Sequence, residues 1–268
     1  MNLQLKGRRA LVTGSSSGIG EAIVRLLVEE GASVVVHGRD RGRAEAIAKE
    51  IGAAGVAIGE LQADGAAEAV HAEAVAALGG NVELLINNAG GNSEGNTSKS
   101  PVDIPIDDYI SNYKANTLGA VRLCQLCVPD MVAASFGRIV NVSSAVAMQP
   151  NFMGVDYSAA KAALNNFTFS LAGSLRDTGV TANVLSPGVI LVDGLVRFGR
   201  MKFGDETMTA DQVNARLAAE KVFEVPPAGR FGLPRELAMV AAMLVSPANG
   251  FINGANYRVD GGQVRGLN

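Results

Sequence analysis

The sequence predicts an α/β fold, a doubly wound parallel sheet of about seven strands with helices on both faces. Short, β-branched apolar runs alternate with longer helical segments, which is the rhythm of βαβ units. Most of these runs are continuous in Val, Ile and Leu, as expected for strands that helices cover on both sides. A chain of 268 residues can bury one large core. We therefore expect residues 1–268 to form a single domain.

Each predicted element follows from local pattern. The expected strands are residues 10–13, 33–37, 55–61, 83–87, 137–143, 180–185 and 255–259. The expected helices are residues 18–30, 40–51, 65–78, 107–117 continuing to about 134, 155–178, 210–221 and 234–245. Between about 189 and 228 the pattern loosens, and Phe and Met alternate with polar residues and glycines. This composition predicts a mobile lid or insert over a substrate site.

Composition and charge exclude several classes of partner. The net charge is -3 and the 23 Lys and Arg residues are scattered, so we expect no nucleic acid partner. The first nine residues lack an apolar signal core, and no run approaches the roughly 18 apolar residues of a membrane span. We therefore expect no membrane partner and a cytoplasmic location.

Cys124 and Cys127 are the only cysteines, with a spacing that superficially matches a redox or metal pair. No second cysteine pair completes a four-ligand site, and His37 and His71 are distant in sequence. The segment around both thiols reads as an apolar helix. We therefore interpret both cysteines as small buried side chains, and we expect no metal site.

A glycine-rich segment follows the first expected strand and opens the first expected helix. It contains Gly14, Ser16, Ser17, Gly18, Ile19 and Gly20. Glycines permit a tight turn and a close backbone approach, and the helix amino terminus can hold a pyrophosphate. A plain glycine turn is the alternative interpretation. The position directly after a strand favours dinucleotide binding instead.

The end of the second expected strand bears on the choice of cofactor. An NAD site would place an acidic residue there for the ribose hydroxyls, whereas this chain has His37, Gly38 and Arg39. Arg39 can bind a 2′-phosphate by charge and paired donors, so we expect NADP(H). The alternative is that the adjacent Asp40 neutralises Arg39 in a solvated surface pair.

Tyr157 and Lys161 lie near the start of an expected helix, where four-residue spacing places both on one face. A nearby cation favours a phenolate and lowers the pKa of the tyrosine, which would make it a usable acid or base. Taken alone, such a pair is more often an amphipathic surface. Ser144 ends the preceding strand, so its hydroxyl can face the phenol at the sheet edge where open α/β sheets bind ligands.

Over essentially its whole length the chain resembles the short-chain dehydrogenase/reductase family, whose domain is a Rossmann fold. The matching motifs are the loop of residues 13–20, Asp64, Asn87-Asn88-Ala89-Gly90, Asn116, Ser144, Tyr157 with Lys161, Pro187-Gly188, and Val259-Asp260-Gly261-Gly262. The family's known members include 3-oxoacyl thioester reductases and enzymes for sugar, steroid, polyol and aromatic alcohol substrates. The resemblance implies an oxidoreductase with a carbonyl or secondary alcohol substrate, assembled as a homotetramer.

The resemblance also implies a role for each matching residue. Ser144 would polarise the substrate oxygen, Tyr157 would exchange its proton, Lys161 would bind the nicotinamide ribose and lower the pKa of Tyr157, and Asn116 would hold a relay water. The residues implied to bind the cofactor are Asp64 at the adenine, Asn88, Ala89 and Gly90 at the adenosine ribose, and Pro187, Gly188 and Ile190 at the nicotinamide. Ser143 is a poorer oxygen ligand than Ser144, because adjacent strand residues point to opposite faces.

Two departures from the family pattern matter. No threonine follows Pro187-Gly188 to bind the nicotinamide carboxamide, so backbone groups would hold it. Ser17 stands where NADP-preferring members often carry a basic residue. The main prediction is hydride transfer between NADP(H) and a carbonyl or secondary alcohol. The alternatives are an NAD-dependent alcohol dehydrogenase of the same family and a non-catalytic nucleotide-sensing protein.

Overall fold

The computed structural model describes residues 2–91, 99–150 and 154–266. Its centre is one sheet of seven strands in the order β3-β2-β1-β4-β5-β6-β7, and every neighbouring pair is parallel. The strands are β1 (Arg9–Val12), β2 (Ser33–Gly38), β3 (Gly55–Ile58), β4 (Leu84–Asn87), β5 (Gly137–Val142), β6 (Val180–Pro187) and β7 (Asn256–Val259). The predicted strand number and parallel arrangement are confirmed.

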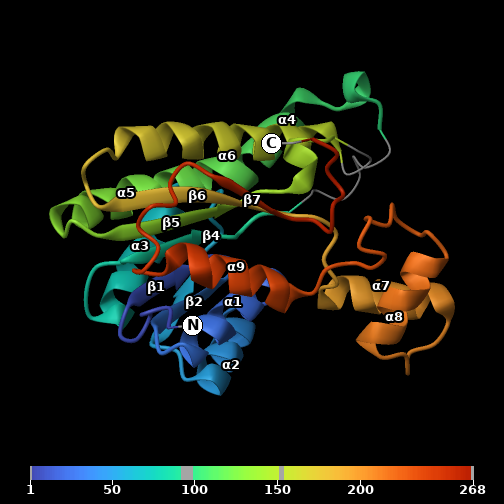
Figure 1. Cartoon of the computed structure of the whole chain (residues 1–268), viewed down its shortest axis with the longest axis horizontal. Coiled ribbons are helices and arrows are strands. Elements are labelled where there is room, and N and C mark those ends of the chain that lie inside the picture. Colours follow the sequence, from blue (N-terminus) through green and yellow to red (C-terminus); the bar gives the residue numbers. More distant parts are fainter. Residues whose placement is uncertain (1, 92–98, 151–153, 267–268) are drawn as a thin grey trace.

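Helices cover both faces of this sheet (Figure 1). They are α1 (Gly18–Glu29), α2 (Arg41–Ile51), α3 (Ala66–Leu78), α4 (Ile106–Tyr113), α5 (Gly119–Ala133), α6 (Val155–Ser174), α7 (Asp193–Phe203), α8 (Ala210–Ala219) and α9 (Pro234–Val245). A π-helical turn, Lys114–Leu118, joins α4 to α5. None of the helices described is long and apolar enough to cross a membrane.

The two layers of helices have separate cores because successive strand residues point to opposite faces. Ala10 and Val12 of β1 pack with α1, α2 and α9 on one side of the sheet. Leu11, between them, packs with α3, α5 and α6 on the other side. The sheet is therefore buried on both faces, and ligands have access to it at the ends of its strands.

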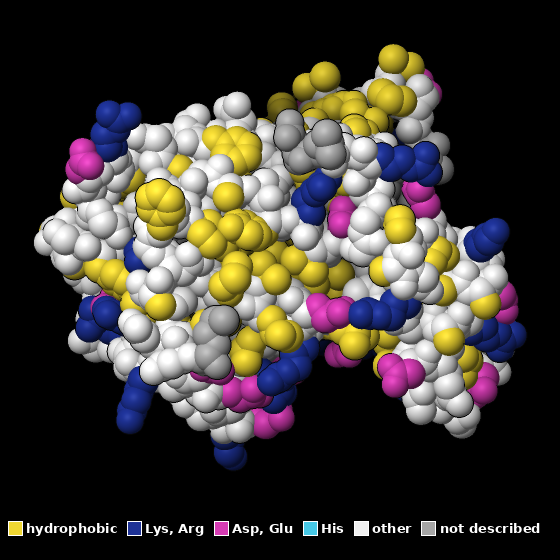
Figure 2. All heavy atoms as spheres, viewed as in Figure 1, with side chains coloured by type: hydrophobic (Ala, Val, Ile, Leu, Met, Phe, Trp, Pro, Cys, Tyr) yellow, Lys and Arg dark blue, Asp and Glu magenta, His cyan; other side chains and the backbone are white. Residues whose placement is uncertain are grey.

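Residues 189–228 form a lobe beside the sheet, which contains α7 and α8 and stands apart from the helical layers (Figure 1). Figure 2 shows a notch between this lobe and the lower part of the body. The lobe has a hydrophobic cluster of its own, formed by Leu191, Val196, Met208, Val213, Leu217 and Phe231. The sequence predicted helix 210–221 here, but it did not predict α7.

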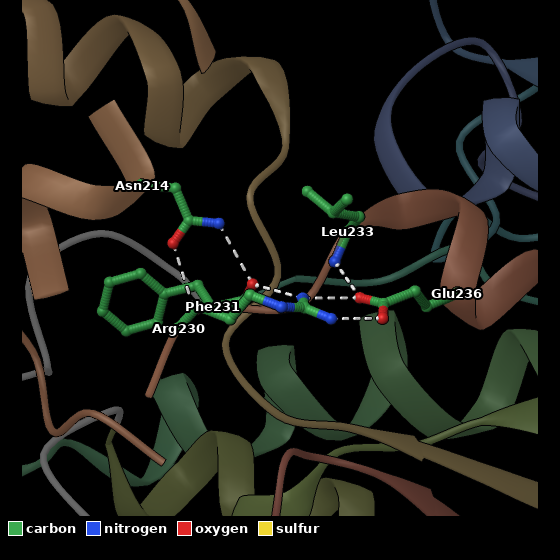
Figure 3. Close-up of polar contacts among 5 residues, drawn as sticks. All are labelled: Asn214, Arg230, Phe231, Leu233 and Glu236. Carbon is green, nitrogen blue, oxygen red and sulfur yellow. Dashed lines mark hydrogen bonds and ion pairs between the residues drawn. The ribbon is translucent and has the colours of Figure 1, made fainter. Parts of the chain in front are cut away.

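Polar contacts attach the lobe to the start of α9 (Figure 3). The side chain of Asn214 donates to the carbonyl oxygen of Phe231 at 3.1 Å and accepts from its amide at 3.0 Å. Arg230 donates to both carboxylate oxygens of Glu236, at 2.9 and 2.7 Å. Its guanidinium, with the Leu233 amide, lowers the pKa of Glu236 to about 2. These contacts fix the segment that follows the lobe.

Two predicted helix ends were wrong by a few residues. Helix α6 ends at Ser174 because the chain turns there, with Asp177 and Gly179 at φ 60° and 77°. Helix α8 ends at Ala219, and Lys221 has φ 51°. Positive φ values are incompatible with a continuing right-handed helix.

Candidate active site

A cleft of about 1010 Å³ opens at the carboxyl ends of the strands. Its wall includes the glycine loop at one end and Ser144, Tyr157 and Lys161 at the other. An adjoining cavity of about 380 Å³ is lined by His37, Arg39 and Leu61, among others. The two cavities share loop residues, so one elongated ligand can extend across both.

The glycine loop makes room for a ligand with its backbone. Gly14 and Gly18 have φ values of 62° and 60°, which side chains rarely tolerate. A Cβ at Gly14 would lie 2.9 Å from the Cα of Ala89, and one at Gly20 would lie 2.8 Å from the Cα of Ser15. Helix α1 begins at Gly18, and its N-cap residue, Ser17, makes no side-chain capping bond. The first-turn amides therefore remain available to an anion.

Neighbouring strands support this loop. The Thr13 hydroxyl accepts hydrogen bonds from the amides of Asn88 and Ala89, at 3.0 and 2.9 Å. The Asn88 side chain donates to the carbonyl oxygens of Thr13 and Gly14, at 2.9 and 3.1 Å. Asn88 and Ala89, predicted from the sequence to lie at the site, thus bind the loop itself.

His37 is a part of the site that the sequence reasoning did not identify. Its Nδ1 accepts from the Gly14 amide at 2.9 Å, and its side chain is buried. Burial lowers the pKa of His37 to about 4, so the ring is neutral at pH 7 and its Nδ1 can accept. The available signal was its position at the end of β2, immediately before Gly38 and Arg39.

The adenosine end differs from the sequence prediction in two ways. Arg39 pairs with Glu60 at 3.0 Å, with its side chain 75% exposed, whereas Asp40 caps α2 by accepting from the Arg43 amide. Asp64 lies in an exposed turn beyond the end of β3 and is not among the residues that line either cavity. Glu60 and Leu61, directly after β3, line the cavity instead. The structure therefore does not bring Asp64 to the cleft.

Ser144 and Tyr157 meet in the cleft. Ser144 is the second residue after the end of β5 and caps a short 3-10 turn by accepting from the Val146 amide at 3.3 Å. A side-chain hydrogen bond joins it to Tyr157, in the first turn of α6. The hydroxyl of Ser143 donates instead to the carbonyl oxygen of Lys161 at 3.2 Å. The preference for Ser144 over Ser143 agrees with this geometry.

Lys161 is buried beneath Tyr157. Its Nζ donates to the carbonyl oxygen of Val142 at 2.9 Å and lies 5.9 Å from the centre of the Tyr157 ring. Burial lowers the pKa of Lys161 to about 8. Burial also raises the pKa of Tyr157, and the Ser144 hydrogen bond offsets only part of that shift. In the chain without cofactor the pKa of Tyr157 is therefore raised, whereas the sequence predicted a lowering, because desolvation by burial is the largest contribution.

Asn116 lies in the π-helical turn and is buried. Its side chain donates to the carbonyl oxygen of Gly91 and accepts from the Gly91 amide, both at 2.9 Å. A Cβ at Gly90 would lie 3.2 Å from the Nζ of Lys161 and would also overlap Asn116. Gly90 therefore allows Asn116 and Lys161 to approach the same point of the cleft wall.

The remaining predicted residues also line the cleft. Pro187 is the last residue of β6, Gly188 and Ile190 follow it, and Ile190 pairs with Gly232 at the base of the lobe. The wall beside Tyr157 is largely apolar, with Val146, Val189, Leu195 and Phe223 near the exposed Arg197. From the sequence we also predict that residues 91–104 and 145–155, together with the lobe, determine substrate specificity. Of these, residues 92–98 and 151–153 lie outside the described part of the chain.

Cys124 and Cys127 lie away from this cleft and are buried in α5. Burial raises the pKa of Cys124 to about 12 and raises that of Cys127 still further. Both thiols therefore stay protonated at neutral pH, which disfavours nucleophilic chemistry.

Comparisons with known proteins show what the chain is similar to. The family model for short chain dehydrogenases matches residues 8–201. The chain is 34% identical to the 3-oxoacyl-[acyl-carrier-protein] reductase of Aquifex aeolicus, with 98% of this chain and 99% of the relative covered. It is 30% identical to the 7alpha-hydroxysteroid dehydrogenase of Escherichia coli, with coverage of 100% and 98%. Among solved structures, the L-sorbose reductase of Gluconobacter frateurii, complexed with NADPH and L-sorbose, superposes with a TM-score of 0.87 at 29% identity, with both chains covered completely.

Proposed function

Because the chain belongs to the short-chain dehydrogenase family of oxidoreductases, we propose that it transfers a hydride between NADP(H) and a carbonyl or secondary alcohol substrate. One observation carries the proposal. The cleft that contains the glycine loop also contains Ser144, Tyr157 and Lys161, so a dinucleotide held by the loop can extend to the proton-transfer groups.

The residues of the cleft fit a bound dinucleotide. The glycine loop leaves open the space that Cβ atoms would fill, and the start of α1 offers amides to the pyrophosphate. Asn88, Ala89 and Gly90 would border the ribose on the adenosine side. Pro187, Gly188 and Ile190 would hold the nicotinamide, with backbone groups in place of the missing threonine. When bound, the nicotinamide supplies or accepts the hydride.

Side chains of the cleft would carry out the proton transfer. Because burial raises its pKa, Tyr157 keeps its proton at neutral pH and can donate it to the oxygen of a carbonyl that is being reduced. Ser144 donates a hydrogen bond to the same oxygen and stabilises its developing charge. Lys161 holds positive charge beneath the phenol, and Asn116 positions a water that returns the proton. Alcohol oxidation reverses these roles.

The preference for NADP(H) rests on Arg39. Its guanidinium borders the adenosine cavity and can bind a 2′-phosphate once it separates from Glu60. Glu60 favours the alternative, NAD(H), because it neutralises Arg39. Solved structures of similar proteins contain either cofactor: the L-sorbose reductase was solved with NADPH and the 7alpha-hydroxysteroid dehydrogenase with NADH. Measuring kcat/KM for both cofactors decides between them.

The lobe of residues 189–228 is proposed to act as a substrate lid. Leu195 and Phe223 of the lobe line the cleft beside Val146, so its movement would open or close the apolar wall. An apolar wall suits a substrate with a substantial apolar part. A panel of β-ketoacyl thioesters, steroid ketones and ketoses, assayed by NADPH consumption, would identify the class.

A homotetramer is the proposed assembly. Hydrophobic side chains gather over α4 at the upper right of Figure 2, where Ile106, Ile110 and Tyr113 are 72%, 49% and 41% exposed. A further apolar side chain, Phe169 of α6, is 43% exposed. Exposed apolar groups at these positions suit a subunit contact. Light scattering after size-exclusion chromatography tests the assembly, and a monomer would contradict it.

The Tyr157→Phe variant tests the proposed chemistry. It removes the phenol oxygen but keeps the ring, so we expect turnover to fall by a factor of about 100 or more while NADPH affinity changes little. Tyr109→Phe is the matched control, because its hydroxyl binds the Pro101 carbonyl oxygen outside the cleft. Near-normal turnover in Tyr157→Phe would overturn the assignment.

A further inference from the structure

A row of buried polar side chains connects α6 to the π-helical turn. Asp156, Asn112 and Asn116 are only 1%, 3% and 2% exposed. The Asn112 side-chain amide donates to the Asp156 carboxylate at 2.6 Å. Asn116 in turn donates to the side-chain oxygen of Asn112 at 3.3 Å and to its carbonyl oxygen at 3.1 Å. The row thus leads from the neighbour of Tyr157 to the residue beside Lys161.

The donor and acceptor groups of these side chains determine which way each hydrogen bond in the row runs. A carboxylate only accepts hydrogen bonds, so Asp156 fixes which end of the Asn112 amide faces it. The side-chain oxygen of Asn112 then faces Asn116, and the NH₂ group of Asn116 donates a hydrogen bond to it. This leaves the Asn116 oxygen to accept from the Gly91 amide, as observed at 2.9 Å. Asp156 therefore fixes the orientation of the Asn112 amide, and the Asn112 oxygen supports the orientation of Asn116 that the Gly91 backbone also requires.

The location of Asp156 suits this task. It precedes Tyr157 in the first turn of α6, where the positive end of the helix favours a carboxylate. Asn112 lies on α4, which packs against α6. The contact therefore joins the helix that carries Tyr157 and Lys161 to the segment that carries Asn116.

We propose that Asp156 and Asn112 are positioning residues, which orient Asn116 and hold the two halves of the proton-transfer machinery in register. This inference rests on the proposed function, since it assigns the pair to the proton path of the same cleft. Their effect passes through Asn116 and the packing of α4 on α6.

A charge-swap experiment tests the proposal. Asn112→Asp places a second carboxylate against Asp156, so we expect kcat to fall by a factor of about 10 to 100, with a nearly unchanged Kd for NADPH. In the double variant Asn112→Asp/Asp156→Asn, the amide at position 156 donates to the carboxylate at position 112. The other oxygen of that carboxylate still faces Asn116. This double variant should recover most of the lost turnover.

Asp156→Asn alone is the milder variant and covers the case in which Asn112→Asp does not fold. It keeps the shape but lets the Asn112 amide turn over, which removes its support from Asn116, so kcat should fall by less than in Asn112→Asp. In each impaired variant the solvent deuterium isotope effect on kcat should rise, because proton transfer becomes slower relative to other steps. A purely structural role would not raise this isotope effect.

Thr168→Val is the matched control for lost stability. It removes a buried hydrogen bond on the same helix, from Asn141 to the Thr168 hydroxyl at 2.8 Å, away from the cleft. We expect a lower Tm with unchanged kcat and isotope effect. Unchanged kcat in both single variants, or a double variant that recovers nothing, would overturn the inference alone. Absence of turnover in the parent protein would overturn the proposed function as well.

Discussion

The glycine-loop end of the cleft and the lobe of residues 189–228 are built in different ways. The loop is fixed by backbone amides and by short contacts from Thr13, His37 and Asn88, which lie at or directly after the ends of β1, β2 and β4. The lobe has its own hydrophobic cluster and joins the body through Asn214, Arg230 and the Ile190–Gly232 bridge. The difference suggests a rigid cofactor cradle beside a substrate wall that can move as a unit.

The largest effect is expected at the cradle, from Gly20→Ala. The new Cβ would lie 2.8 Å from the Cα of Ser15 and would overlap Gly14, so the loop must shift. We expect NADPH affinity to fall by a factor of about 100 and stability to fall by about 3 kcal/mol. Fluorescence titration and urea unfolding measure the two losses.

Gly173→Ala is the control for this change. Gly173 lies in helix α6 with no atom within 4 Å of the added Cβ, so the variant should be neutral or slightly more stable. If Gly20→Ala left NADPH affinity and stability as unchanged as Gly173→Ala does, the cradle would not be rigid and would not differ from the lobe in this respect.

The second prediction concerns the lobe. Asn214→Ala leaves the buried Phe231 amide without its acceptor, which should cost about 2 kcal/mol. Because the cradle is not touched, NADPH affinity should stay near normal while the KM of the substrate rises. Amide hydrogen exchange should be faster in α7 and α8 than in the sheet. Equal acceleration across both regions would contradict a lobe that moves independently.

The third prediction is a pH dependence at the cradle. His37 has a pKa of about 4 in the folded chain against 6.5 in the unfolded chain. Between these values the unfolded chain binds a proton that the folded chain does not, so stability present at pH 7 is lost as the pH falls. The expected loss is about 2 kcal/mol at pH 5. Urea unfolding of the parent and of His37→Gln measures it, and an equal loss in both would show that His37 is not the source.

The smallest effect is expected from Glu60→Gln, which releases Arg39 from an exposed ion pair. Such pairs contribute at most about 1 kcal/mol, so kcat/KM for NADPH should rise by only a factor of about 2 to 5. The value for NADH should stay unchanged, since no 2′-phosphate is present. A fall for NADH, with no rise for NADPH, would mean that Glu60, and not Arg39, determines the choice of cofactor.

The same contrast explains what the sequence could predict. The seven strands, the glycine loop and the Ser144, Tyr157 and Lys161 set depend on short-range patterns: apolar runs, glycines after a strand, and spacing along one helix. Helix α7 was missed because Gly194 and Gly199 lower its helix propensity and its packing partners lie elsewhere in the lobe. Its stability comes from tertiary contacts that local patterns do not show.

Three details of the site could not be predicted from local sequence patterns, because they too depend on tertiary contacts. Arg39 meets Glu60 across the ends of β2 and β3, and Asn112 meets Asp156 across two helices, so both pairs require the folded chain. The pKa of Tyr157 is set by burial, and the spacing of Lys161 alone predicted the opposite direction. Local patterns in the sequence identify the side chains of the site, whereas the folded structure determines their hydrogen-bond partners and their protonation states.

A crystal structure with NADPH bound is the sharpest test of the proposed function. We expect the pyrophosphate at the start of α1 and the nicotinamide between Pro187 and Tyr157, with the Tyr157 hydroxyl facing the reactive ring carbon and room for one carbonyl group between them. A nicotinamide that lies outside this cleft, or a Tyr157 hydroxyl turned away from it, would contradict the proposed hydride transfer.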